Sequence, residues 1–295
     1  MSINWKKTFA VAGVALGTAF VALNVFADKK KNKSIYKDEP EQQNKMQGKK
    51  VVFVENENDP LNADGMKGHL EAIGDSEHFP TIYERYIKRA FDVSFSFMGL
   101  VLLSPVFAAT AVAIKLDDPG PALFTQKRVG GDKQYFMLHK LRSMKMCTPH
   151  DVPTHMLDDP DQYLLKVGRF IRKFSIDELP QIWDIFVGNM SFIGPRPALW
   201  NQDFLISERD KYGANDIKPG LTGLAQIRGR DELEIPEKAK LDGVYTDALK
   251  GGSLTGLLMD TKVFFGSISA VLKSDGIVEG GTGQMAKEFK KAENK

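Results

Sequence analysis

Cysteine is nearly absent from this sequence of 295 residues, in which Cys147 is the single example. One cysteine cannot form a disulfide within the chain, and its scarcity fits a reducing compartment. An excess of either charge is also missing, because 40 lysine and arginine residues face 38 aspartate and glutamate residues, giving a net charge of +2. We therefore expect no nucleic acid partner. The 42% hydrophobic content is enough to build a sizeable core.

An uncharged segment lies near the N-terminus, from Thr8 to Ala27, with the length needed to cross a bilayer as a helix. We predict that residues 1–28 form a transmembrane anchor. A cleaved export signal is the alternative, because the end of the segment resembles a signal-peptidase site. The positive-inside rule places the downstream chain in the cytoplasm, because more lysines follow the segment than precede it. Those that follow are Lys29, Lys30, Lys31 and Lys33, against Lys6 and Lys7 before it.

Residues 29–80 are polar, with tracts rich in lysine and in glutamate and asparagine. Only Val51–Val54 resembles a strand. This composition predicts a partly disordered linker between the anchor and the rest of the chain. Residues 276–295 contain several glycines and end in lysines, and we expect them to form a flexible tail.

A second apolar stretch covers residues 88–115, with basic residues at both ends and Ser104 and Pro105 in its middle. Proline removes a helical hydrogen bond and bends the helix axis. The stretch is long enough to be a second spanning helix with a proline kink. The equal basic flanks and the proline argue for a break instead, which would return the chain to the side of the polybasic linker. The residues alone leave both interpretations open.

Two runs typical of β-strands flank Gly130 and Gly131 in ALFTQKRVGGDKQYFMLHKLRSM, which predicts a hairpin. On the second strand Lys140 and Arg142 share a face, because side chains alternate with a period of two. These two cations are therefore expected to project together. A solvated strand face would show the same pattern.

Two adjacent carboxylates, Asp177 and Glu178, precede Pro180 in KFSIDELPQIWDIFVGNMSFIGPRP. Proline is tolerated in a first helical turn, so we expect a helix to begin near Asp177. The free N–H groups there would favour an anion. Simple capping is the alternative, because Ser175 followed three residues later by Glu178 matches a capping box. That box would place Pro180 deep enough in the helix to clash with a carbonyl.

Cations surround this carboxylate pair in the sequence. Such a cluster suits a phosphate-handling site with a divalent ion, because charge on phosphate oxygens must be neutralised. A solvated ion-pair face would look similar. The cations are Arg169, Arg172, Lys173 and Arg196.

Two further segments follow toward the C-terminus. From Lys218 to Asp231 we expect a loop, a strand and a second loop, in which glycines and the cations Lys218, Arg228 and Arg230 could approach phosphate. From Leu254 to Lys273 apolar residues recur at helical spacing, which predicts an amphipathic helix that packs on the core or lies in the membrane interface.

Four stretches in order resemble the bacterial sugar transferases, the monotopic polyprenol-phosphate phosphoglycosyl transferases. They cover most of the chain from about Tyr83 to Lys273. The sequence departs from the family pattern at three positions. Asp184 stands where Asn is usual, Asn189 stands where Asp is usual, and Leu224 stands where Trp is usual. The stretches are KVGRFIRKFSIDELPQIWDIFVGNMSFIGPRP, FTQKRVGGDKQYFMLHKLRSM, KPGLTGLAQIRGRD and LDGVYTDALKGGSLTGLLMDTKVFF.

The resemblance implies an α+β, mainly helical, monotopic membrane protein. A phosphoglycosyl transferase domain would span residues 81–275 and contain a re-entrant helix-break-helix over 88–115, broken at Ser104 and Pro105. A small β-hairpin and amphipathic interfacial helices would complete the fold. The catalytic domain would lie on the cytoplasmic face of the cell membrane. A homo-oligomer is compatible with this arrangement.

The implied reaction moves a sugar-1-phosphate from a nucleotide diphosphate sugar, expected to be a UDP-sugar, to polyprenol phosphate. Asp177 would be the nucleophile, Glu178 would hold Mg²⁺, and Lys140 and Arg172 would complete the catalytic set. A glycosyl transferase that releases UDP and a non-catalytic membrane scaffold are the alternatives. The substrate-binding residues would be Arg128, Arg142, Arg196, Pro197, Lys218, Arg228 and Arg230.

Overall fold

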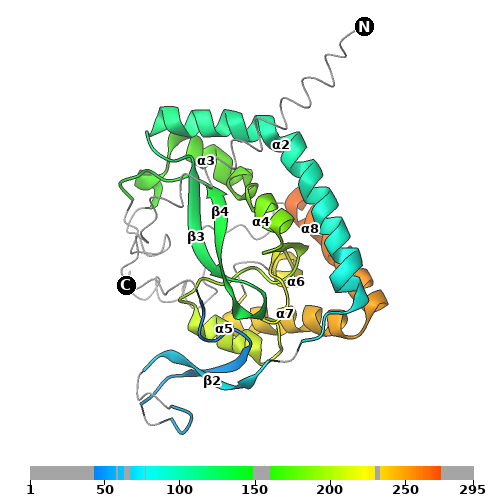
Figure 1. The fold of residues 1–295 in the computed structure, drawn as a ribbon. Coiled ribbons are helices and arrows are strands. Elements are labelled where there is room, and N and C mark those ends of the chain that lie inside the picture. Colours follow the sequence, from blue (N-terminus) through cyan, green and yellow to red (C-terminus); the bar gives the residue numbers. More distant parts are fainter. Residues whose placement is uncertain are drawn as a thin grey trace. The chain divides into compact units, whose positions relative to one another are not determined.

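A computed structural model describes residues 43–57, 59–62, 67–76, 78–148, 160–229 and 233–273 (Figure 1). The predicted anchor, the predicted tail and Arg230 lie outside these residues. The chain divides into two compact units. The first contains residues 93–126 and the described parts of 138–187, and the second contains the described parts of 40–92, 127–137 and 188–295.

The described chain is mainly helical, as predicted, and its strands form two-stranded sheets. In chain order the elements are β1 (Lys49–Val54), β2 (His69–Asp75), η1 (Tyr83–Lys88), α2 (Arg89–Asp117), β3 (Leu123–Val129), η2 (Gly131–Lys133), β4 (Tyr135–Leu141), η4 (Pro160–Tyr163), α3 (Lys166–Lys173), η5 (Ile176–Glu178), α4 (Gln181–Val187), β5 (Ser191–Ile193), α5 (Asp203–Asp210), β6 (Gly220–Thr222), α6 (Leu224–Arg228), α7 (Ile235–Lys250) and α8 (Ser253–Lys273).

The π-helical turn η1 and α2 together form a helix, Tyr83–Asp117, that is long and apolar enough to cross a membrane by length and composition. Only 28% of its most apolar window is buried. The helix continues through Pro105, but its ribbon bends about midway (Figure 1). Proline lacks the N–H that a straight helix needs, and Ser104 Oγ donates to the Val101 carbonyl at 2.8 Å. The expected break is therefore a bend within one helix.

The first unit is held together by the inner side of α2. Leu100 and Phe107 pack on Ile182 of α4, and further along Ala111 and Ile114 join a second cluster. That cluster reaches the hairpin strands and α3 through Ala122, Leu123, Leu141, Leu165 and Ile171. Burial of these side chains fixes α3, α4 and the end of β4 around the same helix.

The predicted hairpin is confirmed, since β3 and β4 pair in one sheet on either side of Gly130 and Gly131. In the second unit, β5 and β6 pair in parallel, with Ser191 opposite Gly220 and Ile193 opposite Thr222. A β-carbon at Gly194 would lie 2.6 Å from the Lys218 carbonyl oxygen, so only glycine fits where these chains meet.

Within the predicted linker of residues 29–80, β1 and β2 pair antiparallel, so these two segments are folded strands. β1 packs on α5 through Val51 and Ile206, and the Val51 N–H donates to Asp210 Oδ2 at 2.6 Å. The polar composition was misleading because a two-stranded sheet with one covered face needs few apolar residues. A strand of six residues with Val51 and Val54 buried is enough.

Candidate active site

Asp177 and Glu178 lie in the 3₁₀ turn η5, and α4 begins only at Gln181, after Pro180. A helical turn therefore begins near Asp177, as predicted, but it is a 3₁₀ turn, and the α-helix itself starts only at Gln181. The capping-box alternative is wrong, because Ser175 makes no side-chain cap hydrogen bond. Ser175 has a left-handed backbone with φ of 53°, which costs a residue with a β-carbon about 1–2 kcal/mol. This backbone turns the chain sharply between α3 and the two carboxylates.

Lys140 on β4 forms an ion pair with Glu178, with Nζ 3.0 Å from Oε1. A contact one residue earlier fixes the strand at this point. The buried Asp184 of α4 accepts the His139 backbone N–H at 3.0 Å and bonds its ring Nδ1 at 2.8 Å. Burial raises the pKa of Asp184, and His139 opposes that rise. The strand that carries Lys140 is thus tied to the helix that follows the carboxylates.

Asp177 is 9% exposed, and its environment is electrostatically mixed. Burial raises the pKa of this carboxyl above its usual range, and the neighbouring Glu178 adds to the rise. Lys140 is the strongest opposing influence, and Arg172 at the end of α3 acts in the same direction. The first unit therefore brings together the four residues predicted to be catalytic, as two carboxylates facing two cations.

The pKa of Asp177 predicts how activity responds to pH if its carboxylate is the nucleophile. The acidic limb of the rate profile should lie above the ordinary aspartate range, because the proton is held more tightly. Lys140→Met should move that limb to higher pH, since Lys140 lowers the pKa most. The initial rate measured between pH 4 and 9 tests this. An unshifted limb in a folded variant would contradict the assignment of this pKa to Asp177.

Arg142 does not contact the carboxylate pair in this structure. Its Nη1 lies 2.6 Å from Asp118 Oδ2, and Nη2 bonds the Asp118 carbonyl. The same carboxylate accepts the Met146 N–H at 2.8 Å. Arg142 follows the end of β4 and is buried, so it joins the exit of α2 to the hairpin. Lys140 and Arg142, which were predicted to project together from one strand face, therefore bind two different acidic residues, Glu178 and Asp118.

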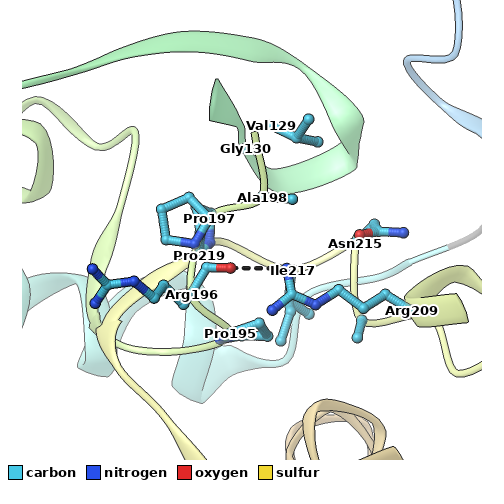
Figure 2. Close-up of a pocket in the computed structure, with 11 residues that line it drawn as sticks. Val129, Gly130, Pro195, Arg196, Pro197, Ala198, Arg209, Asn215, Ile217 and Pro219 are labelled. Atoms are coloured by element: carbon cyan, nitrogen blue, oxygen red, sulfur yellow. Dashed lines mark hydrogen bonds between the residues drawn. The ribbon is translucent and has the colours of Figure 1, made fainter. Parts of the chain in front are cut away.

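In the second unit, arginines hold the backbone of the Pro195–Ala198 loop. Arg128 Nη1 donates to the Pro197 carbonyl at 3.0 Å. Arg209 Nη1 donates to the Arg196 carbonyl at 2.8 Å (Figure 2). The Nε of Arg209 donates to Asp242 Oδ2 at 2.8 Å. A small hollow behind the loop is lined by Pro195, Arg196, Pro197, Arg209 and Asn215, among others. Arg128, predicted to bind substrate, thus holds the loop backbone here through the Pro197 carbonyl. The sequence did not point to Arg209 and Asp242.

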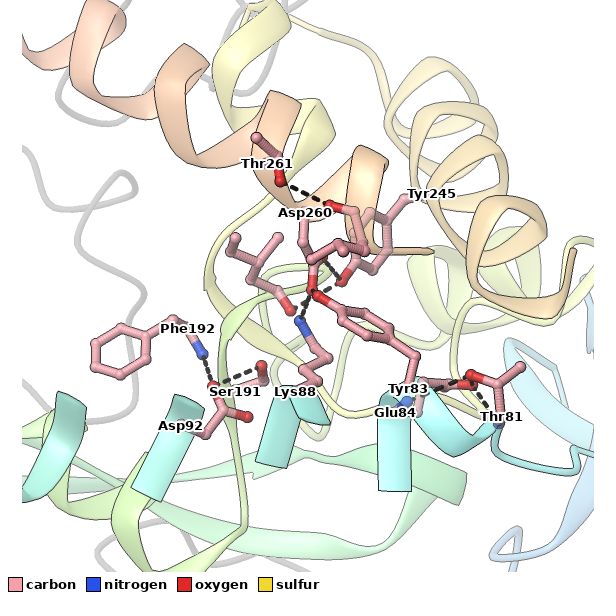
Figure 3. Close-up of polar contacts among 12 residues, drawn as sticks. Thr81, Tyr83, Glu84, Lys88, Asp92, Ser191, Phe192, Tyr245, Asp260 and Thr261 are labelled. Atoms are coloured by element: carbon pink, nitrogen blue, oxygen red, sulfur yellow. Dashed lines mark hydrogen bonds and ion pairs between the residues drawn. The ribbon is translucent and has the colours of Figure 1, made fainter. Parts of the chain in front are cut away.

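A buried polar network at the base of α2 was also missed. Asp260 of α8 accepts Tyr83 Oη and Lys88 Nζ, each at 2.6 Å, and Tyr245 Oη at 2.6 Å on its other oxygen (Figure 3). Tyr245 Oη also lies 3.1 Å from the carbonyl of Ile193 in β5. The sequence signal that could have revealed the network is Asp260, because this aspartate lies at helical spacing from the small and apolar residues on the buried side of α8.

The remaining predicted cations belong to the segment after residue 217. Lys218 lies two residues before β6 and is exposed. Arg228 is the last residue of α6 and is exposed. The segment thus contains the expected strand, but a short helix replaces the second loop.

The chemistry of the carboxylate pair fits a Mg²⁺ ion only if substrate completes the ligand set. No group of three or more His, Cys, Asp or Glu side chains suited to a metal occurs within the part of the chain that the structure describes. Mg²⁺ is commonly held by one or two carboxylates together with substrate phosphates and water. Asp177 and Glu178 supply that minimum.

The carboxylate pair and its cations thus lie in the same unit as most of α2, a helix long and apolar enough to cross a membrane. The family described as bacterial sugar transferase matches residues 83–274, and the chain belongs to it. An exopolysaccharide production protein of Rhizobium leguminosarum is 34% identical over 198 residues, 63% of this chain and 95% of that protein. A sugar transferase of Bacillus subtilis is 35% identical over 191 residues, 65% and 90% of the two chains.

A larger relative has a named reaction. The UDP-glucose:undecaprenyl-phosphate glucose-1-phosphate transferase of Escherichia coli is 40% identical over 157 residues. The match covers 52% of this chain and 34% of that protein. The present chain therefore spans about a third of the length of this relative.

Proposed function

We propose that this protein transfers a sugar-1-phosphate from a UDP-sugar to a polyprenol phosphate and releases UMP. The observation that carries the proposal is the buried Asp177, held beside Glu178 and within the electrostatic influence of Lys140 and Arg172. The Escherichia coli relative is named for a reaction of the same kind. The proposed place of the reaction is the first membrane step of glycan assembly.

Asp177 acts as the nucleophile in this proposal. A carboxylate oxygen attacks the phosphorus next to the sugar, and the bond from that phosphorus to the bridging oxygen breaks, so UMP leaves with the electron pair. An oxygen of the lipid phosphate then attacks the same phosphorus and returns Asp177 to its carboxylate form. Two steps at one residue let two anionic substrates use the same site in turn.

The cations of the first unit lower the cost of bringing an anionic substrate to a carboxylate. Lys140 and Arg172 favour the ionised form of Asp177, which the first step needs. They also offset the charge that phosphate oxygens gain in the transition state. Glu178, with Asp177, would hold Mg²⁺, and the bound ion would supply further neutralisation of phosphate charge.

Exposed apolar stripes support placement at a membrane. On α2, Phe91, Phe95, Met98 and Leu102 recur at helical spacing and are exposed. On α8 the outer side carries Leu254, Leu257, Leu258, Phe264, Phe265 and Ile268, while Val263 faces the core. Such faces are suited to lipid. We infer that α8 lies in the interface, that α2 enters the bilayer and returns, and that the site faces the cytoplasm.

The re-entrant path makes a prediction for chemical labelling. Arg85→Cys and Leu116→Cys, each in a chain with Cys147→Ser, place a thiol at an exposed position near either end of the bent helix. Both thiols should react with a membrane-impermeant maleimide only from the cytoplasmic side. Pro105→Ala should straighten the helix and favour labelling from opposite sides. Labelling of the two ends from opposite sides without that substitution would show a spanning helix.

The reaction is tested by incubating membranes that contain the protein with a panel of UDP-sugars and polyprenol phosphate. Release of UMP together with a lipid-linked diphosphate sugar is expected for one of the sugars. Release of UDP would instead identify a glycosyl transferase. Turnover of no sugar in the panel would favour a scaffold.

A further inference from the structure

The β1–β2 sheet lies before residue 83, where the family match begins, yet it packs on the part of the second unit that holds the Pro195–Ala198 loop. Val51 of β1 is 3% exposed and belongs to one buried cluster with Ile206 of α5, Val129 of β3 and Ala198. The Val129 N–H in turn donates to the Ala198 carbonyl at 2.9 Å. The sheet therefore supplies part of the apolar support behind this loop.

A polar route joins the same strand to the loop through the end of α5. The Val51 N–H donates to Asp210 Oδ2 at 2.6 Å, and the other oxygen of Asp210 accepts Lys133 Nζ at 2.7 Å. Lys133 is completely buried. Arg209, the residue before Asp210, donates to the Arg196 carbonyl at 2.8 Å (Figure 2). Two adjacent residues of α5 thus bond the sheet and the loop.

The segment that leads into β1 holds the turn between β3 and β4. Asn44 Nδ2 donates to the Lys133 carbonyl at 2.7 Å, and the Gly48 N–H donates to the Asp132 carbonyl at 3.2 Å. Asp132 and Lys133 have φ of 53° and 59°, a left-handed backbone that costs about 1–2 kcal/mol at each residue. These hydrogen bonds help to hold that turn. The turn follows directly after β3, whose last residue, Val129, bonds the loop.

Every carbonyl of the loop accepts a hydrogen bond from another segment. The Gly220 N–H donates to Pro195 at 2.8 Å, Arg209 to Arg196 at 2.8 Å, Arg128 to Pro197 at 3.0 Å and Val129 to Ala198 at 2.9 Å. Two of these donors, Arg209 and Val129, belong to the elements on which the sheet packs. The backbone from which the Arg196 side chain extends is therefore fixed in part by β1.

We propose that the β1–β2 sheet is a positioning element that holds the Pro195–Ala198 loop in the shape that binds a UDP-sugar. The proposal rests on the proposed function, because the family resemblance gives Arg196 and Pro197 to substrate binding. A guanidinium on a fixed backbone loses less freedom when it binds phosphate, so a rigid loop favours affinity. The sheet itself needs no contact with the substrate.

Hydrogen exchange at single-residue resolution, on the full chain in detergent, tests whether the sheet holds the loop. Val51→Ala removes two methyl groups from the shared cluster, and Asp210→Asn removes the charge that pairs with the buried lysine. Each should speed exchange of the Val129 and Gly220 N–H groups about tenfold, because both donate to loop carbonyls. Val52→Ala is the matched control, since this side chain points to the opposite face of β1.

Titration of the same preparations with UDP, the part common to all UDP-sugars, tests the consequence for binding without turnover. Val51→Ala and Asp210→Asn should each weaken UDP binding about tenfold, and Val52→Ala should not. In a chain with Arg196→Gln, Val51→Ala should have little further effect, because the sheet acts through the loop that carries this arginine. An equal effect in both backgrounds would show a general loss of stability and overturn the positioning role.

Unchanged exchange in both folded variants would also overturn the proposal. Faster exchange with unchanged UDP affinity would overturn the role in substrate binding. A wild-type chain that binds no UDP would refute this proposal together with the proposed function. A chain that binds UDP, loses affinity in both variants and transfers no sugar phosphate would refute the proposed function alone and leave the positioning role standing.

Discussion

Replacing Asp177 by asparagine should abolish transfer while the protein stays folded. The substitution keeps the shape of the side chain but removes the attacking oxyanion, so the rate should fall by about 10⁴-fold or more. The pKa of Asp177 in the folded protein is raised above its unfolded value. The ionised form therefore weakens folding as pH rises through that pKa, and an uncharged asparagine removes this penalty. Stability at neutral pH should be unchanged or higher.

Initial rates and thermal unfolding of the same preparations separate the two effects. Asp161→Asn is the matched control, because Asp161 is an exposed aspartate of η4 in the same unit, and it should keep full activity. Glu178→Gln should retain a low rate and need more Mg²⁺, because one carboxylate charge is lost. Substantial turnover by Asp177→Asn would refute the covalent route.

Replacing Asp260 by alanine should destabilise the protein by about 3–5 kcal/mol, the cost expected when a buried ion pair loses one partner. Asp260 accepts Lys88 and two tyrosine hydroxyls, and it is nearly inaccessible to solvent. Alanine would leave the Lys88 ammonium, whose side chain is 12% exposed, without this carboxylate. Both tyrosine hydroxyls would lose an acceptor in the same substitution.

Denaturant unfolding of the detergent-solubilised protein measures this loss. Thr261→Ala is the neighbouring control, because its exposed hydroxyl bonds only within α8, to the Leu257 carbonyl at 2.8 Å. It should change the free energy of unfolding by less than about 0.5 kcal/mol. A loss below about 1 kcal/mol for Asp260→Ala would show that the network does not hold the base of α2 to α8.

Local patterns in the sequence predicted the elements that depend on near neighbours. The period of two around Gly130 and Gly131 predicted the β3–β4 hairpin, and helical spacing after Leu254 predicted α8. The apolar residues of α8 lie mostly on its outer side. Spacing alone could not reveal this, because it shows that the apolar residues share one face of the helix but not whether the protein core or the membrane covers that face.

Contacts between distant parts of the chain could not be predicted in this way. The docking of β1 on α5 depends on Val51 meeting Ile206 and Asp210, more than 150 residues away. The turn at Asp177 depends on the left-handed backbone of Ser175, which a capping pattern concealed. The acidic partners of Lys140 and Arg142 likewise come from separate segments. In each case tertiary packing decided between local alternatives.

The central claim is that Asp177 becomes covalently linked to a phosphosugar, and the most direct measurement is the mass of its peptide. The wild-type protein is incubated with the UDP-sugar alone, quenched in acid and digested. The peptide that contains Asp177 should gain the mass of one sugar phosphate, and addition of polyprenol phosphate before quenching should remove it. The same peptide unmodified in an active preparation, while UMP appears only when lipid is present, would contradict the account.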